Sequence, residues 1–139
     1  MTINDLVKEA HENALSHGFW DDPPEFGTII ALIHSELSEA LEEVRADRPA
    51  RYFPCNAGGM CCEERDWNTK CGSRVCDPED PGVYCKAKSS KPEGWAVELA
   101  DAVIRIADYC GHAGIDLESI IREKMDYNST RPYKHGKRF

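Results

Sequence analysis

The stretch GWAVELADAVIRIADYCG, Gly94–Gly111, decides the fold of this chain of 139 residues. Its residues are almost all apolar, and at about 100° per residue they cover nearly every side of a helix. Four ionisable residues interrupt them within an arc of about 80°: Glu98, Asp101, Arg105 and Asp108. A helix this apolar is expected to be largely buried. Its narrow charged stripe is therefore either the one side of the helix that faces solvent or a side that lines a binding site.

Two further helices are predicted before this stretch. The first covers Ile3–Ser16, where apolar residues recur on one face. The second opens at Asp22, which is the expected N-cap, with Pro23 at the first helical position. Glu25 occupies the capping-box position, and the apolar period continues to about Asp47.

The quoted helix is expected to begin near Pro92 and to end at Gly111 or Gly114. A fourth helix is expected to start after Asp116 as its cap and to run to Pro132. We therefore predict a single domain over residues 1–139, with an all-α four-helix bundle as its framework.

The segment from about 47 to 91, between the second and third helices, has neither helical nor strand period. It holds six of the seven cysteines: Cys55, Cys61, Cys62, Cys71, Cys76 and Cys85. We predict a cysteine-rich irregular insertion here. Four of these thiols can hold one structural Zn²⁺, and disulfides or free thiols remain alternatives because the spacing contains no C-x-x-C pair. Cys110 is read as a small core residue.

Two pairs of carboxylates recur at the same helical spacing. Glu36 and Glu39 lie three residues apart on the second helix, as do Glu98 and Asp101 on the third. If these edges face each other, four carboxylates converge and repel one another, which raises their pKa values. A hard divalent cation such as Mg²⁺ resolves this repulsion. The alternative is that both stripes are solvated helix faces.

Composition and charge argue against several other classes of function. The chain has no apolar run long enough to span a bilayer and no apolar N-terminal signal stretch, so we expect a cytoplasmic protein without membrane contact. The net charge is −8; residues 122–139 hold six Lys or Arg and two acidic residues, which leaves −12 on the rest. An acidic body with a basic tail does not indicate nucleic-acid binding.

Three segments carry a resemblance to a known family: HSELSEALEE at 34–43, VELADAVIRI at 97–106, and the tail GIDLESIIREKMDYNSTRPYKHGKRF at 114–139. With them the chain resembles the MazG-like all-α nucleoside triphosphate pyrophosphohydrolases. The resemblance implies a MazG-like bundle that forms a homodimer or homotetramer. It also implies Mg²⁺, or Mn²⁺ in its place, bound by Glu36, Glu39, Glu98 and Asp101, and cleavage of a nucleoside triphosphate between its α and β phosphates.

The resemblance has one departure in its first motif. The family pattern Glu-Glu-x-x-Glu has Ser35 at its first position here, and Glu43 on the same helix face can supply the missing charge. The gap between the two motifs is also longer than usual, because it holds the insertion. We expect Glu39, or a neighbouring carboxylate, to orient or deprotonate the attacking water.

The basic tail supplies candidate phosphate contacts. Lys124, Asn128 and Arg131 share one face if the last helix reaches that far, and the resemblance implies phosphate contacts for them, with Tyr133 and Lys134 close by. Trp20, between the first two helices, is a candidate for stacking on a base.

Two other functions fit the same residues. The first is a non-catalytic helical dimer that uses its cysteine-rich arm to bind a partner, a reading that Ser35 favours. The second is an enzyme that acts on another metabolite containing a pyrophosphate group. Release of pyrophosphate from a panel of nucleoside triphosphates with Mg²⁺ distinguishes the nucleotide pyrophosphohydrolase from the non-catalytic dimer.

Overall fold

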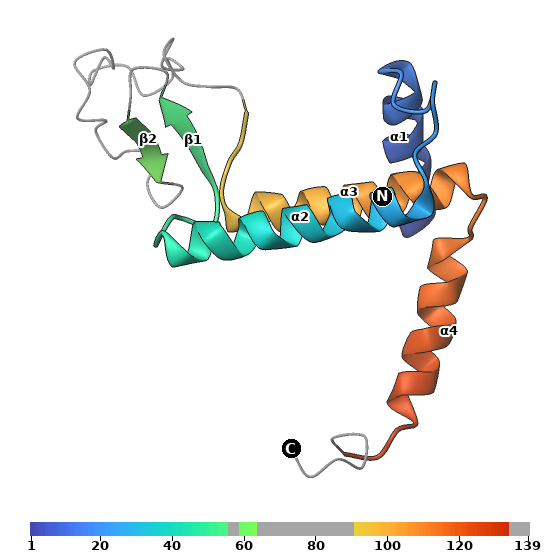
Figure 1. The fold of residues 1–139 in the computed structure, drawn as a ribbon. Helices are drawn as coiled ribbons and strands as arrows, with labels where there is room; N and C mark the ends of the chain where they lie inside the picture. The colour runs from blue at the N-terminus through green and yellow to red at the C-terminus, as the bar shows by residue number, and fades with distance from the viewer. Residues whose placement is uncertain (56–58, 64–90, 134–139) are drawn as a thin grey trace. The chain divides into compact units, whose positions relative to one another are not determined.

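The computed structural model of the chain describes residues 1–55, 59–63 and 91–133. Four helices form its framework, which confirms the predicted all-helical class (Figure 1). They are α1 (Ile3–Ser16), α2 (Phe26–Arg45), α3 (Trp95–His112) and α4 (Leu117–Ser129), with a pair of short strands, β1 (Tyr52–Cys55) and β2 (Gly59–Glu63), between α2 and α3.

The chain divides into two compact units. The first unit comprises residues 1–29 and 103–139, and the second comprises residues 30–102. Within the described residues, no helix combines the length and the apolar character that a bilayer crossing needs.

Helix α1 begins and ends where its sequence predicts. A capping box fixes the start: the Asp5 amide donates to Thr2 Oγ1 at 3.0 Å, and the Thr2 amide donates to Asp5 Oδ2 at 2.7 Å. These bonds to Thr2 lower the pKa of Asp5. At the other end Gly18 has φ 75°, a left-handed conformation that closes the helix after Ser16.

The predicted start of α2 is wrong by a few residues. The helix begins at Phe26, and the Glu25 carbonyl accepts from the amides of Thr28 and Ile29. Asp22 and Pro23 therefore lie outside it. The reason is that Pro24 follows Pro23, and a residue before proline is pushed away from the helical region.

The predicted start of α3 at Pro92 is also wrong, because the residues before Trp95 are paired with the segment around Tyr52. Glu93 and Tyr52 exchange two backbone hydrogen bonds, of 2.8 and 2.9 Å, which make an isolated antiparallel bridge. Gly94 has φ 117°, and a β-carbon there would lie 2.7 Å from the Ala50 carbonyl oxygen. Only a glycine fits this turn without strain, and the helix starts directly after it.

Helix α4 is capped by Asp116, as predicted, whose side chain accepts from the Ser119 amide at 3.1 Å. Its end is earlier than predicted, at Ser129 instead of Pro132. The Ser129 and Thr130 hydroxyls donate to carbonyls of the preceding turn, at 2.6 and 2.7 Å, and the following Pro132 disfavours helix at the residue before it.

Part of the insertion that was predicted to be irregular is a two-stranded antiparallel pair. Strands β1 and β2 pair Pro54 with Met60 and Cys55 with Gly59, and the register shifts between Tyr52 and Pro54. The sequence gives no period-two signal here. The rest of the insertion lies outside the described residues.

The core of the first unit is small and lies where α1 meets α3. Val7, Ala10, Ala107 and Cys110 are buried together, so the predicted core role of Cys110 is confirmed. The helices approach closely at Gly111, where an added β-carbon would lie 2.5 Å from the His11 β-carbon.

The expectation that the apolar surface of α3 is largely buried is wrong for the single chain. Leu99 is 42% exposed, whereas Glu98 beside it is only 7% exposed. Further along the helix, Val103, Ile104 and Ile106 are exposed as well. The charged residue is thus the buried one in the first turns of α3, and several large apolar residues face outward.

Candidate metal centre

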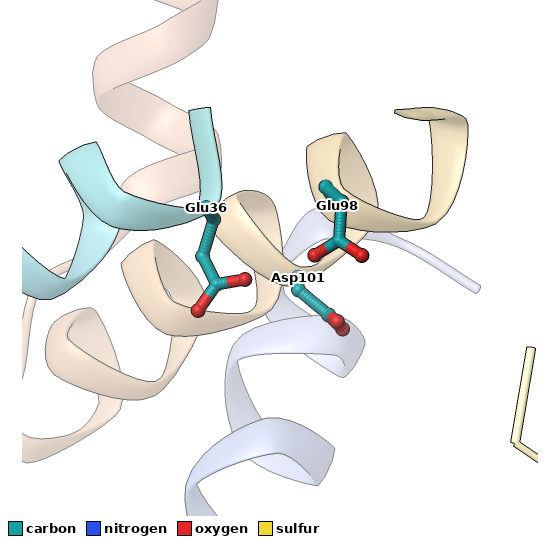
Figure 2. Close-up of side chains that lie close together, drawn as sticks. All are labelled: Glu36, Glu98 and Asp101. Atoms are coloured by element: carbon teal, nitrogen blue, oxygen red, sulfur yellow. The ribbon is translucent and has the colours of Figure 1, made fainter. Parts of the chain in front are cut away.

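Three carboxylates converge in the second unit, one from α2 and two from α3 (Figure 2). One oxygen each of Glu36, Glu98 and Asp101 lies within 4.8 Å of the other two. Glu98 and Asp101 are three residues apart, which places both side chains on one face of α3. The acidic edges of α2 and α3 thus come together at these three residues, as predicted.

Burial makes this cluster unusual among acidic groups. Glu36 and Glu98 are each only 7% exposed, whereas carboxylates are almost never fully buried unless they are paired. Burial first, and then the charges of Glu39 and Asp101 and a hydrogen bond with Glu36, together raise the pKa of Glu98 to about 7. A hydrogen bond between two carboxyl groups requires a proton on one of them, and the raised pKa assigns that proton to Glu98.

The donor set fits a hard divalent cation. All three groups offer carboxylate oxygens, which Mg²⁺ and Ca²⁺ prefer over nitrogen and sulfur ligands. Oxygens bound to one Mg²⁺ at about 2.1 Å lie no more than about 4.2 Å apart, so small side-chain rotations bring the present 4.8 Å into range. A bound cation replaces the proton that Glu98 otherwise retains.

Glu39, predicted as both ligand and catalytic base, lies outside the group of three. Its side chain is exposed, one turn along α2 from Glu36, and its charge raises the pKa of Glu98. It is therefore near the cluster without being one of the three converging oxygens.

The other two residues of the first motif have different partners. Ser35, at the position of the missing carboxylate, donates its hydroxyl to the Leu32 carbonyl of its own helix at 2.7 Å. Glu43 accepts from Arg48 Nη1 at 2.7 Å and from the Tyr52 hydroxyl at 3.2 Å. Glu43 is therefore paired at the base of the insertion and is not one of the three converging carboxylates.

The remaining acid of the α3 stripe, Asp108, belongs to the first unit. His11 Nδ1 and Trp20 Nε1 each lie 2.8 Å from Asp108 Oδ1. His11 was not predicted as a partner; its place four residues after Val7, on the buried side of α1, is the signal that could have found it.

Trp20 is stacked within the first unit. Its indole lies on the His112 ring, with centroids 3.8 Å apart and planes 9° from parallel. One face of the indole is therefore covered, so a base that stacks on Trp20 needs the opposite face or must displace His112.

The candidate phosphate-binding residues of the tail are exposed. Lys124 and Asn128 lie on α4, and the Lys124 ammonium is 5.0 Å from the centre of the Tyr127 ring. Arg131 and Tyr133 follow the end of the helix, so the predicted single helical face does not extend to Arg131. Lys134 lies outside the described residues.

The proposed zinc ligands fall largely outside the described part of the chain. Cys71, Cys76 and Cys85 lie in residues 64–90, which the structure does not describe. Cys55, Cys61 and Cys62 lie in β1 and β2. The choice between Zn²⁺, disulfides and free thiols stays a prediction.

Comparison of the chain with protein-family models, with curated proteins and with solved structures found no match. The functional assignment therefore depends on the residues of the site and on their chemistry.

Proposed function

We propose that the protein is a Mg²⁺-dependent nucleotide pyrophosphohydrolase that cleaves a nucleoside triphosphate between its α and β phosphates. The observation that carries the proposal is the convergence of Glu36, Glu98 and Asp101, two of them buried. The resemblance of the two acidic motifs and the tail to the MazG-like family supports it. A buried carboxylate cluster without a cation destabilises the fold, so its presence is best explained by a bound ion.

In this proposal Glu36, Glu98 and Asp101 hold the cation, with Mn²⁺ as an alternative to Mg²⁺. The bound ion supplies charge neutralisation at the phosphates and lowers the pKa of a coordinated water. The ordinary pKa of bulk water is too high for a carboxylate alone to deprotonate it, and an acidic site repels a triphosphate unless a cation bridges them.

Glu39 is the candidate catalytic carboxylate. It lies near the cluster and is exposed, so it is accessible to a water molecule beside the bound substrate. The water oxygen forms a bond to phosphorus, the bond from that phosphorus to the bridging oxygen breaks, and Glu39 takes the proton from the water. The products are a nucleoside monophosphate and pyrophosphate.

Substrate contacts outside the cluster are proposed for the basic tail and for Trp20. Lys124, Asn128 and Arg131 are exposed and carry cationic or amide donors suited to phosphate oxygens. Tyr133 and Lys134 follow them, and Trp20 offers one indole face to a base.

A second copy of the chain is proposed to cover the apolar face of α2. Leu37, Leu41 and Val44 recur at spacings of four and three residues, and each is about half exposed. Leu99 of the same unit is similarly exposed. A helix face this apolar favours association, and a homodimer or homotetramer removes it from water. Sedimentation of the protein, compared with its Leu41→Glu variant, tests this association.

The enzyme assignment is tested by the release of pyrophosphate from a panel of nucleoside triphosphates with Mg²⁺. Glu98→Gln is expected to abolish release, whereas Glu12→Gln, which changes an exposed carboxylate on α1, retains it. Absence of release from every nucleotide by a folded wild-type protein favours the non-catalytic dimer instead. Release from other compounds with a pyrophosphate group, but not from triphosphates, keeps the site and changes the substrate.

A further inference from the structure

Three side chains join the end of α2 to the segment that follows it. Tyr52 is central among them and is only 5% exposed. Its hydroxyl donates to Glu43 Oε2 at 3.2 Å and accepts from Arg48 Nη1 at 3.0 Å. Arg48 Nη1 also donates to Glu43 Oε1 at 2.7 Å, so each of the three contacts both others. We call them the Tyr52 network; it satisfies a hydroxyl whose burial without partners costs free energy.

The same segment also holds the start of α3. The backbone of Tyr52 exchanges two hydrogen bonds with that of Glu93, at 2.8 and 2.9 Å. Two residues earlier, the Ala50 carbonyl accepts from the Ala96 amide at 3.0 Å. That amide is one of those that the first turn of a helix leaves without an intrahelical partner. Glu98 follows Ala96 by two residues in this first turn, so residues 50 and 52 fix the backbone from which Glu98 projects.

Apolar packing within one chain does less to fix α3 along α2. The buried hydrophobic residues described on these helices in the second unit are small, Ala40 on α2 and Ala102 on α3. The large residues Leu37, Leu41 and Leu99 are each nearly half exposed. Since dispersion attraction grows with the number of atoms in contact, side chains this exposed contribute little to the register of the two helices.

We propose that Tyr52 and Arg48 are positioning residues of the candidate metal centre, which act by fixing α3 against α2. This inference rests on the proposed function. Glu43 lies two turns, about 10 Å, along α2 from Glu36, and Glu98 lies in the first turn of α3. The Tyr52 network therefore joins the helices close to the carboxylates that they contribute. A rotation of α3 by one residue position, about 100°, would turn Glu98 away from Glu36.

Arg48→Met and Arg45→Met form a matched pair for a test. Both remove one cationic group at the end of α2, but Arg45 pairs with Glu42, at 2.7 Å, outside the Tyr52 network. Removal of a nearby cation by itself favours Mg²⁺ binding, whereas loss of positioning weakens it, so the two effects have opposite signs. Tyr52→Phe removes only the hydroxyl and changes no charge. The affinity for Mg²⁺ is measured by calorimetry on proteins that circular dichroism shows to be folded.

Arg48→Met and Tyr52→Phe are each expected to lower the affinity for Mg²⁺ by about 10-fold, as loss of an outer-shell partner of a metal site does. The double variant should lose little more, because both changes break the same network. Arg45→Met should bind Mg²⁺ at least as tightly as wild type. Asp116→Ala, which removes the cap of α4, should be less stable than wild type and yet bind Mg²⁺ equally.

Kinetics give a second measurement that a loss of stability alone would not change. In pyrophosphate release, Arg48→Met and Tyr52→Phe should need about 10-fold more Mg²⁺ for half of their maximal rate. Both should reach the kcat of wild type once Mg²⁺ is saturating, because the carboxylates themselves are unchanged.

Equal affinity for Mg²⁺ in wild type, Arg48→Met and Tyr52→Phe overturns this inference and leaves the proposed function standing. The inference also fails if Arg48→Met binds Mg²⁺ as tightly as Arg45→Met does. The Arg48 side chain is 45% exposed, so its variant gives a result even if a change at buried Tyr52 prevents folding. If wild type binds no Mg²⁺, the proposed function itself fails and the positioning role fails with it.

Discussion

Glu98→Gln is expected to stabilise the metal-free protein at pH 8. The pKa of Glu98 is raised from 4.5 to about 7, chiefly by burial and next by the charge of Glu39. A difference of about 2.5 in pKa corresponds to about 3 kcal/mol between the two protonation states. Glutamine has the same shape and carries no charge, so it avoids this cost.

The sign follows from which state holds the proton. The folded pKa lies above the unfolded one, so between about pH 4.5 and about pH 7 the folded protein binds a proton that the unfolded chain has released. The stabilising contribution of protonated Glu98 is therefore complete below about pH 4.5 and is lost as the pH rises through about 7. The unfolding free energy of wild type should fall by about 3 kcal/mol by pH 8 because of this group, and that of Glu98→Gln should not fall for this reason.

Urea unfolding with a chelator at pH 5 and pH 8 measures the effect. The difference in unfolding free energy between Glu98→Gln and wild type should be about 2.5 kcal/mol larger at pH 8 than at pH 5, because the unfolded chain is already largely ionised at pH 5. At about 3 °C per kcal/mol, the melting temperature of the variant at pH 8 should exceed that of wild type by about 10 °C. Glu12→Gln, at an exposed site, is the control and should show no such difference.

Addition of Mg²⁺ should reverse the order of stability. Wild type gains stability as the ion binds, and the gain should be larger at pH 8 than at pH 5, because protons compete with the ion for Glu98. Glu98→Gln should gain little. Equal stability of the two proteins at pH 8 without metal would refute the argument that Glu98 is buried at a cost.

Three further changes test the packing and caps of the first unit by urea unfolding. Gly111→Ala should lose about 1–3 kcal/mol, because its β-carbon meets His11; unchanged stability would show that the helices can separate there. Trp20→Phe should lose about 1–3 kcal/mol with its hydrogen bond to Asp108, and a smaller loss would mean that solvent replaces the indole. Asp116→Ala removes the cap of α4 and should cost about 1 kcal/mol; its circular dichroism should show less helix.

Local sequence signals predicted the helices well where neighbouring residues decide the boundary. Both ends of α1 and the cap of α4 follow from a few adjacent side chains. The start of α3 does not, because Gly94 and Glu93 are held by contacts with residues some forty positions earlier. Periodicity also could not show that Leu99 is exposed in the single chain, since it reports which residues are apolar and not what covers them.

Only part of the candidate site could be predicted, because helical spacing does not show which distant residues come into contact. Glu36, Glu98 and Asp101 follow from helical spacing together with one assumption, that two acidic edges meet. Helical spacing alone could not show that Asp101 joins the cluster whereas Asp108 has other partners in the first unit.

The bridge between Tyr52 and Glu93 makes the intervening segment an interchangeable module. Its two ends are joined by their own backbone hydrogen bonds. These bonds, and not contacts of the helices, offset the entropy cost of closing that loop. Residues 53–92 could thus be swapped for a short turn, or for a foreign domain with adjacent termini, while the helical scaffold stays assembled.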